Sequence, residues 1–356
     1  MYLGVLPVMT VRELASGIDA LYLSGRAELE DSFLDGLERA RDRARASDGP
    51  VPYRLGGVEF GLAPYGWHRY AFRLSHEYGL IGFTGSKKLP AIRVQPRAEL
   101  LHGIGARAAF ETISGLLASV GDIQWGASRV DLFADVQGWW PTVEQRDRFV
   151  CRATTRDTFE ESGRLTGFQF GRRKGGGLSA RIYDKSGQAR KSGAYWWWDK
   201  WGDRYVDGEP VTRVEFEAGR TILRECGVDS LDDAIREVAA LWGYFTDWLS
   251  FRVQSEDLTK SRWPVAPEWE AIRNASLRDL PVTLSRTMGA RTAAHEKRVV
   301  AGLGGYLASF AAIRDLTGLS DSLSTAESVL RLWEVETGIP FTDRVKRKRR
   351  DWEWGL

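Results

Sequence analysis

The sequence contains few of the residues that build disulfide frameworks and zinc sites. Its 356 residues include two cysteines, Cys151 and Cys226, and four histidines. Two distant cysteines provide neither a disulfide framework nor the spacing of zinc ligands, which is typical of a protein from a reducing compartment. The sequence also lacks a G-x-x-x-x-G-K-S/T motif, which disfavours an ATP-dependent helicase.

Membrane-spanning and secretory patterns are absent as well. The first residues show no cationic region followed by a continuous apolar run, so no secretory signal is predicted. The longest mostly apolar stretch, 299–313, is glycine-rich and too short to cross a bilayer of about 30 Å, and it predicts a buried helix. We therefore expect a cytoplasmic protein with no membrane role.

Neither sign of charge dominates the chain. With 50 basic and 48 acidic residues the net charge is +2, so the overall electrostatics do not demand a nucleic-acid partner. Between residues 164 and 204, however, ten basic residues stand against three acidic ones. This bias would attract a polyanion to the segment, although a solvated basic loop has the same composition.

Hydrophobic periodicity predicts an α+β fold with a large, mainly antiparallel, curved sheet and helices packed on one face. A strand and a surface helix at 18–46 precede a meander of short strands at 57–97 and a helix at 106–121. Strands at 127–138, 166–173, 178–185 and 211–219 follow, with a helix expected to begin near 141–145 and another expected over 231–251. Strands followed by a helix, twice over, suggest an internal duplication.

The chain is predicted to divide into two domains. A Pro/Trp-rich joint at 259–269 separates the sheet-forming part from a segment with helical patterns and a basic end, Lys-Arg-Lys-Arg-Arg at 346–350. We expect a first domain over 1–258 and a helical C-terminal module over 259–356. Helices that simply cover one face of the sheet would show the same pattern.

Three of the predicted strands each present a polar face, because alternate residues of a strand project to the same side. The opposite face of the first of these strands is uniformly apolar. The residues of the polar faces are Arg129, Asp131, Phe133 and Asp135 in the first strand, Arg181, Tyr183 and Lys185 in the second, and Arg213, Glu215 and Glu217 in the third.

If these strands are neighbours, four carboxylates and one phenol converge on one surface. Carboxylate oxygens suit Mg²⁺ or Mn²⁺, which would neutralise the charge of a substrate phosphate and stabilise a leaving oxygen. Tyr183 could attack that phosphate, provided that Arg181, Lys185 or the metal favours the phenolate over the phenol, whose usual pKa is about 10. Cross-strand salt bridges on a solvated sheet face would give the same sequence pattern.

Four segments resemble a known family, the rolling-circle plasmid replication initiators of the replication-initiation-factor (Rep_trans) type and related relaxases of conjugative elements. SRVDLFADV at 128–136 is similar to the family's R-x-D strand, and TGFQFGRRKGGGLSARIYDKSGQ at 166–188 to its basic turn and I-Y-D-K strand. TRVEFE at 212–217 resembles its R-x-E-x-E strand, and SRWPVAPEWEAI at 261–272 a segment that follows the catalytic region. The resemblance covers most of 125–272.

The resemblance implies a metal-dependent, site-specific DNA nicking and joining enzyme. Tyr183 matches the tyrosine that attacks the scissile phosphodiester, which leaves the protein on the 5′ phosphate and frees a 3′-OH. Asp131 and Glu215 best match the metal-binding acidic positions, with Asp135 and Glu217 as additions, and the metal would be Mg²⁺ or Mn²⁺. The residues expected to contact DNA are Arg172, Arg173, Lys174, Arg181, Lys185 and Arg213.

The partners implied by the resemblance are origin DNA, single-stranded or cruciform at the nick, a second copy of the chain and a host helicase. A homodimer would supply two tyrosines, one to open the replication cycle and one to close it. The element served, whether plasmid, phage or conjugative island, stays open. Relaxases that bind metal through a His-x-His pair are disfavoured, because the four histidines include no such pair.

The segment between the I-Y-D-K and R-x-E-x-E strands departs from the family pattern, since it is longer and contains four tryptophans. Trp196–Trp198 could stack on unpaired bases or form a hairpin packed on the sheet. Tyr195 and Tyr205 in this segment are rival nucleophiles. Two other classes of function remain: a non-catalytic, sequence-specific DNA-binding protein, and a structural protein whose acidic pairs are ordinary salt bridges.

Overall fold

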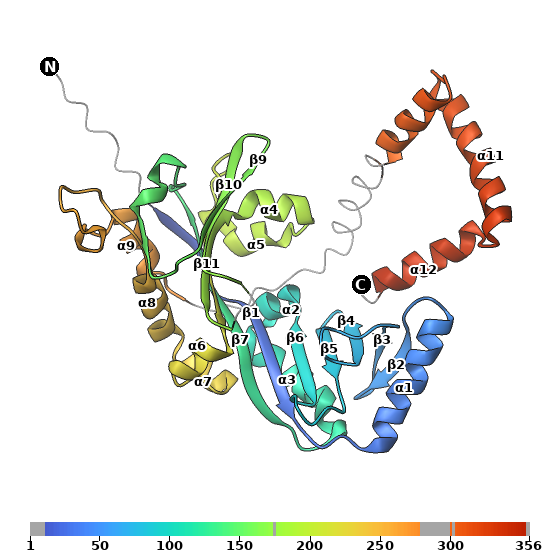
Figure 1. The fold of residues 1–356 in the computed structure, drawn as a ribbon, viewed down its shortest axis with the longest axis horizontal. Helices are drawn as coiled ribbons and strands as arrows, with labels where there is room; N and C mark the ends of the chain where they lie inside the picture. Colours follow the sequence, from blue (N-terminus) through green and yellow to red (C-terminus); the bar gives the residue numbers. More distant parts are fainter. Residues whose placement is uncertain (1–10, 174–175, 278–299, 301–302, 354–356) are drawn as a thin grey trace.

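The computed structural model describes residues 11–173, 176–277, 300 and 303–353, and its centre is a strongly curved sheet (Figure 1). Eleven strands form the sheet in the order β2-β3-β4-β5-β6-β1-β7-β12-β11-β10-β9. Each neighbouring pair in the sheet is antiparallel. The predicted class, α+β with a large antiparallel sheet, is confirmed.

The first half of the chain contributes the long strand β1 and a meander of short strands, as predicted for 57–97. Turns separate the short strands, and in β6 buried residues alternate with half-buried ones. The elements are β1 (Arg12–Arg26), α1 (Asp31–Ala46), β2 (Val51–Leu55), β3 (Val58–Leu62), β4 (Phe72–His76), β5 (Gly79–Phe83), β6 (Ile92–Pro96), α2 (Ala98–Ile104), α3 (Ala106–Leu117) and the 3₁₀ turn η1 (Ala118–Val120).

The second half begins with a second long strand, β7. The predicted strands at 166–173, 178–185 and 211–219 are present as β10, β11 and β12. The elements are β7 (Gln124–Gln137), η2 (Glu144–Arg148), β8 (Phe149–Cys151), β9 (Arg156–Glu161), β10 (Arg164–Phe170), β11 (Leu178–Asp184), α4 (Lys185–Ser192), α5 (Trp196–Trp201), η3 (Gly202–Arg204), β12 (Thr212–Gly219), α6 (Arg220–Glu225), α7 (Leu231–Arg236), α8 (Val238–Trp248), β13 (Leu249–Phe251), η4 (Lys260–Arg262) and α9 (Pro267–Arg273).

The order of strands supports the suggested duplication. In each half the long first strand pairs with the last strand of that half, β1 with β6 and β7 with β12. The remaining strands of each half continue outward from that last strand, and β1 and β7 join the halves at the centre. The two halves therefore repeat one topology, although they share no visible residue-level repeat.

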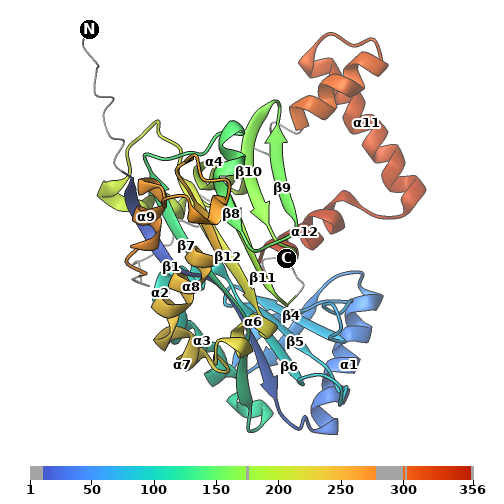
Figure 2. The ribbon, with the colours of Figure 1, turned by 60° about the vertical axis from the view of Figure 1, so that its left-hand side comes forward.

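Most of the helices lie on one face of the sheet, as Figure 2 shows for α3, α6, α7 and α8. They bury the apolar face of the central strands, where Val130, Leu132 and Phe216 have no exposed surface. Helices α4 and α5 instead cover part of the opposite, polar face. There Trp197, Trp201 and Phe133 form a second buried cluster.

The segment after the sheet remains attached to it as far as Leu277. Trp269 and Ile272 of α9 are fully buried, and the backbone N–H of Leu277 donates to the Ser16 hydroxyl at 2.7 Å. The part of the chain that packs on the sheet thus extends past the predicted boundary at 258. The division into two domains stays a prediction.

The described C-terminal residues are helical, in 303–313, α11 (Leu319–Thr337) and α12 (Phe341–Glu353). The apolar run at 299–313 was predicted to be a buried helix, but Tyr306 and Ile313 are about four-fifths exposed. The basic end at 346–350 lies within α12. Among the described residues, no helix has the length and apolar character needed to span a bilayer.

Other local predictions need correction. A 3₁₀ turn, η2, replaces the helix expected near 141–145, and the helix expected over 231–251 is divided into α7, α8 and strand β13. The tryptophan-rich segment forms the short helix α5, so the hairpin prediction for Trp196–Trp198 is wrong. Trp197 is buried against the sheet and has no surface free for a base.

Candidate functional site

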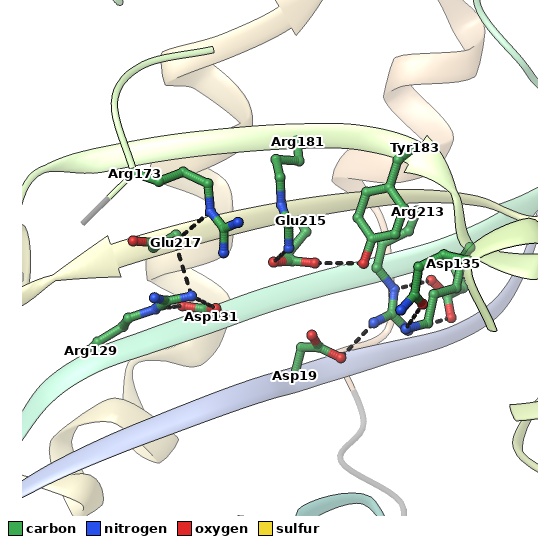
Figure 3. A network of polar contacts seen from close by, with 12 residues as sticks. Asp19, Arg129, Asp131, Asp135, Arg173, Arg181, Tyr183, Arg213, Glu215 and Glu217 are labelled. Atoms are coloured by element: carbon green, nitrogen blue, oxygen red, sulfur yellow. Dashed lines mark hydrogen bonds and ion pairs between the residues drawn. The ribbon is translucent and has the colours of Figure 1, made fainter. Parts of the chain in front are cut away.

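The three polar faces meet on one surface of the sheet, as their alternation predicts (Figure 3). Strand β12 lies between β7 and β11. Glu217 is paired with Asp131 across the β7–β12 ladder, and Glu215 with Arg181 across the β11–β12 ladder. The predicted tyrosine and the predicted carboxylates therefore belong to one cluster, and Asp135 pairs there with Arg213.

Tyr183 is held by the carboxylate next to it. Its hydroxyl donates to Oε2 of Glu215 at 2.8 Å, and Arg181 donates to the other oxygen, Oε1, at 2.5 Å. The Arg181 guanidinium also lies 5.0 Å from the centre of the tyrosine ring. Burial, followed by the charge of Glu215, raises the pKa of Tyr183 well above its usual value, so the phenol is protonated at neutral pH.

A second group of contacts surrounds Asp131 and Glu217. Arg129 donates to both oxygens of Asp131, at 2.7 and 2.5 Å, and lies 2.9 Å from Oε2 of Glu217. Arg173 donates to the same Glu217 oxygen at 2.9 Å. Burial, with Glu215 as the strongest charge acting in the same direction, raises the pKa of Asp131 to about 7 despite Arg129. The cost of removing the Asp131 carboxylate from water therefore outweighs its contacts with Arg129.

Asp135 has a different environment from the one predicted. Arg213 donates to both of its oxygens, at 2.6 and 2.8 Å, and the indole N–H of Trp201 donates to Oδ2 at 2.9 Å. Asp135 has no exposed surface. Its lone pairs are used within the protein, so Asp135 does not fit the predicted metal ligand and instead fixes Arg213 and α5.

Arg213 is a structural residue at this site, and the expectation that it contacts DNA is not met. Its guanidinium is completely buried between Phe133 and Trp197, 4.1 Å from the centre of each ring. Its third nitrogen, Nη1, donates to Asp19 at 2.5 Å. The guanidinium therefore connects β12 to β7, β1 and α5 at one point.

Sequence reasoning missed Asp19 and His102. Asp19 lies at an irregularity of β1, between the paired residues Ile18 and Ala20, and this places its carboxylate on the polar face. Nε2 of the buried His102 lies 3.2 Å from Oδ1 of Asp19. Burial lowers the pKa of His102. The only sequence signal for Asp19 is an acidic residue inside an otherwise apolar strand.

Lys185 also differs from its prediction. It is the first residue of α4 rather than a strand residue, it is buried, and its ammonium donates to Gln188 at 3.0 Å above the ring of Trp197. Burial, followed by the charge of Arg213, lowers its pKa to about 8. It has almost no surface with which to contact DNA in this arrangement.

The other residues predicted to contact DNA differ in their accessibility. Arg172 is exposed, whereas Arg173 and Arg181 are partly buried and engaged by Glu217 and Glu215. Lys174 lies outside the described residues. The rival Tyr195 is exposed at the start of α5 and is not part of the cluster around Glu215. Tyr205 stacks on Trp201, with ring centres 5.5 Å apart.

The cluster suits a hard divalent cation in its donor chemistry. Asp131, Glu215 and Glu217 supply only oxygen atoms, the donors that Mg²⁺ and Mn²⁺ prefer, and burial raises the pKa of Asp131. Arginines engage these oxygens, and the described residues include no group of three or more His, Cys, Asp or Glu side chains already placed to hold a metal ion. Metal binding would require Arg129 to move away from Asp131.

The fold and the cluster define an antiparallel α+β protein with a half-buried tyrosine among carboxylates and arginines. No protein-family model matches the chain. A curated relative, "Uncharacterized protein ORF430" of Pseudomonas phage Pf1, is 26% identical over 254 residues, which cover 56% of this chain and 57% of the relative's length. The chain therefore matches little more than half of that relative.

One solved structure to which the chain shows similarity is that of a rolling circle replication initiator protein from Geobacillus stearothermophilus. The similarity has a TM-score of 0.44 at 13% identity, and it covers 76% of this chain and 99% of the other. Neither likeness assigns a role to any residue of this chain.

Proposed function

We propose that the chain is a site-specific DNA strand transferase that initiates rolling-circle replication of a plasmid, phage or conjugative element, with Tyr183 as the nucleophile. The observation that supports this proposal most directly is the hydrogen bond from the Tyr183 hydroxyl to Glu215 in the arginine-rich cluster. A phenol hydrogen-bonded to a carboxylate has a proton acceptor in place, which a nucleophile with a raised pKa needs.

The reaction balances with the residues of the cluster. The Tyr183 oxygen forms a bond to the scissile phosphorus as its proton passes to Oε2 of Glu215. The bond from phosphorus to the 3′ oxygen breaks, and that oxygen takes up a proton to become the free 3′-OH. The 5′-phosphotyrosine retains the energy of the broken phosphodiester, so the reverse reaction rejoins the strand without ATP.

The arginines of the cluster would stabilise the charge of the transition state. Arg181 already contacts both the ring of Tyr183 and Glu215, so it lies where a phosphate attacked by Tyr183 would be placed. We propose that Asp131 and Glu217 hold a Mg²⁺ or Mn²⁺ ion, which would supply Lewis-acid stabilisation of the phosphate oxygens when bound. A homodimer would then present two Tyr183 side chains. The molar mass of the protein in solution tests whether it is a dimer.

A nicking assay tests the proposed function. Wild-type protein should convert a supercoiled plasmid that contains the cognate origin to open circles when Mn²⁺ is present. Tyr183→Phe removes only the nucleophilic oxygen and should abolish nicking while DNA binding is retained. Tyr195→Phe is the matched control and should nick normally, and nicking by Tyr183→Phe at the wild-type rate would refute the assignment.

A non-catalytic DNA-binding protein is the second candidate. The observation that favours it is that every carboxylate of the cluster already has an arginine partner, as in ordinary cross-strand ion pairs. Tight, specific binding of origin DNA without nicking under any divalent metal would support it.

A further inference from the structure

A row of alternating arginine and aromatic side chains leads away from the Tyr183 cluster across the first half of the sheet. The Arg129 guanidinium, which binds Asp131, lies 4.8 Å from the centre of the Tyr22 ring. Arg93 lies 5.4 Å from the same ring and 4.6 Å from the ring of Trp67. We call Arg129, Tyr22, Arg93 and Trp67 the arginine–aromatic row.

The register of the strands places this row on the same face as the cluster. Tyr22 of β1 is paired with Arg129 of β7, and its neighbour on that face, Ser24, is paired with Arg93 of β6. The intervening Leu21 and Leu23 point into the core. The row therefore continues the polar face from β7 over β1 to β6.

A glycine in β5 makes room for the far end of the row. Gly82 is paired with Arg93 on one side and with Arg73 on the other. A Cβ atom at Gly82 would lie 3.1 Å from Tyr70 and 3.2 Å from Trp67, closer than side chains normally approach. Because glycine has no side chain, both rings from the β3–β4 connection can lie directly over the sheet.

The arginines at this end lack acidic partners in the described part of the chain. Arg73 and Arg93 form no ion pair there, and the Nε atom of each is buried without a hydrogen-bond acceptor. This differs from the Tyr183 cluster, where Arg129, Arg173 and Arg181 all contact carboxylates. Positive charge without a partner, on a partly exposed face, favours a polyanionic ligand.

The chemistry of the row fits one kind of polyanion. Tyr22 and Trp67, both half-buried, can stack on bases only if those bases are unpaired, while Arg93 and Arg73 can bind the connecting phosphates. We propose that the arginine–aromatic row, with Arg73, is a binding track for single-stranded DNA that continues from Tyr183 over the first half of the sheet. The inference rests on the proposed function, in which a strand is opened at Tyr183.

Binding measurements on the full chain test the track. All variants carry Tyr183→Phe so that cleavage cannot alter the DNA, and the probe is a fluorescent single-stranded oligonucleotide of the cognate region, followed by anisotropy. Trp67→Ala and Arg93→Gln should each weaken binding about tenfold. Arg93→Gln should also lower the slope of log affinity against log salt by about 0.7, the effect of one phosphate contact on a single strand.

Matched variants separate stacking from loss of charge and from misfolding. Trp67→Phe keeps an aromatic ring and should retain most of the affinity that Trp67→Ala loses. Arg43→Ala removes one exposed positive charge from α1, the helix on the opposite face of the sheet, and should bind as the parent does. If Trp67→Ala and Arg93→Gln lose no more DNA affinity than Arg43→Ala does, the proposed track is refuted.

The outcome is independent of the chemistry at Tyr183. If no cleavage is found with wild-type protein but Trp67→Ala and Arg93→Gln still weaken binding, the nuclease proposal fails and the track stands. If cleavage occurs but these variants bind normally, the track fails alone. Equal affinity for duplex DNA, lost to the same extent in these variants, would overturn the single-strand assignment.

Discussion

At the scale of single residues, the side chains of the site differ in how deeply they are buried. Tyr183 is half-buried and donates a hydrogen bond to the buried Glu215, whereas Asp135 and Arg213 have no exposed surface and make their contacts within the protein. The sequence predicted that all four share one polar surface, and this is confirmed. It could not separate their roles, because alternation along a strand shows the side on which a residue lies and not its depth.

Breaking the buried Asp135–Arg213 pair should destabilise the protein strongly. Asp135→Ala leaves the Arg213 guanidinium between two aromatic rings with only Asp19 to offset its charge. We expect a loss of about 3–5 kcal/mol in the free energy of unfolding, measured with urea. Arg172→Ala, at an exposed position, should change it by less than about 0.5 kcal/mol. An unchanged urea midpoint for Asp135→Ala would contradict this account of the pair.

Lys185 should make stability depend on pH above neutrality. Its pKa is about 8 in the folded protein and 10.5 in an unfolded chain, so the unfolded state binds more protons between these values. Stability should therefore rise as pH increases through this window. Relative to Lys185→Met, the wild type should gain about 2 kcal/mol between pH 7 and pH 10. The exposed substitution Lys191→Met should leave the pH profile unchanged, and identical profiles for wild type and Lys185→Met would refute the shift.

At the scale of elements, strands with a clear alternation were predictable and elements fixed by distant contacts were not. The apolar face of β7 and the meander β3–β6 follow directly from period-two patterns. Strand β9 was missed because its residues are almost all polar and exposed, as is usual at a sheet edge. Helix α5 was misread because four tryptophans suit a strand in isolation, whereas burial of Trp197 and Trp201 against Phe133 stabilises a helix here.

The close packing of β10 against β11 can be tested at Gly167, which is paired with Tyr183. A Cβ at this position would lie 2.6 Å from the backbone oxygen of Ile182 and 3.0 Å from Cβ of Tyr183. Gly167→Ala should therefore destabilise the protein by about 1–3 kcal/mol and displace Tyr183. Gly115→Ala, at an open position of α3, should stabilise it by about 0.5–1 kcal/mol. If Gly167→Ala stabilised the protein as Gly115→Ala does, β11 would have room for a Cβ atom at position 167.

At the scale of the whole molecule, the duplicated topology places two different surfaces on one continuous face. The second half supplies the Tyr183 cluster, and the first half supplies the arginine–aromatic row, with β1 and β7 between them. The motifs in the second half could be recognised from the sequence. The arginine–aromatic row could not be recognised, because Trp67, Arg93 and Tyr22 are distant in the chain. They meet only when β1 pairs with β6 and Gly82 leaves room for the β3–β4 connection.

The central claim is that Tyr183 attacks a DNA phosphodiester, and mass spectrometry of the reaction tests it most directly. Protein would be incubated with Mn²⁺ and single-stranded oligonucleotides tiled across the cognate origin region, digested, and searched for a peptide that carries a 5′-phosphonucleotide. We expect the adduct on Tyr183 and none in Tyr183→Phe protein. An adduct on Tyr195 or Tyr205, or tight DNA binding with no adduct on any substrate, would contradict the account.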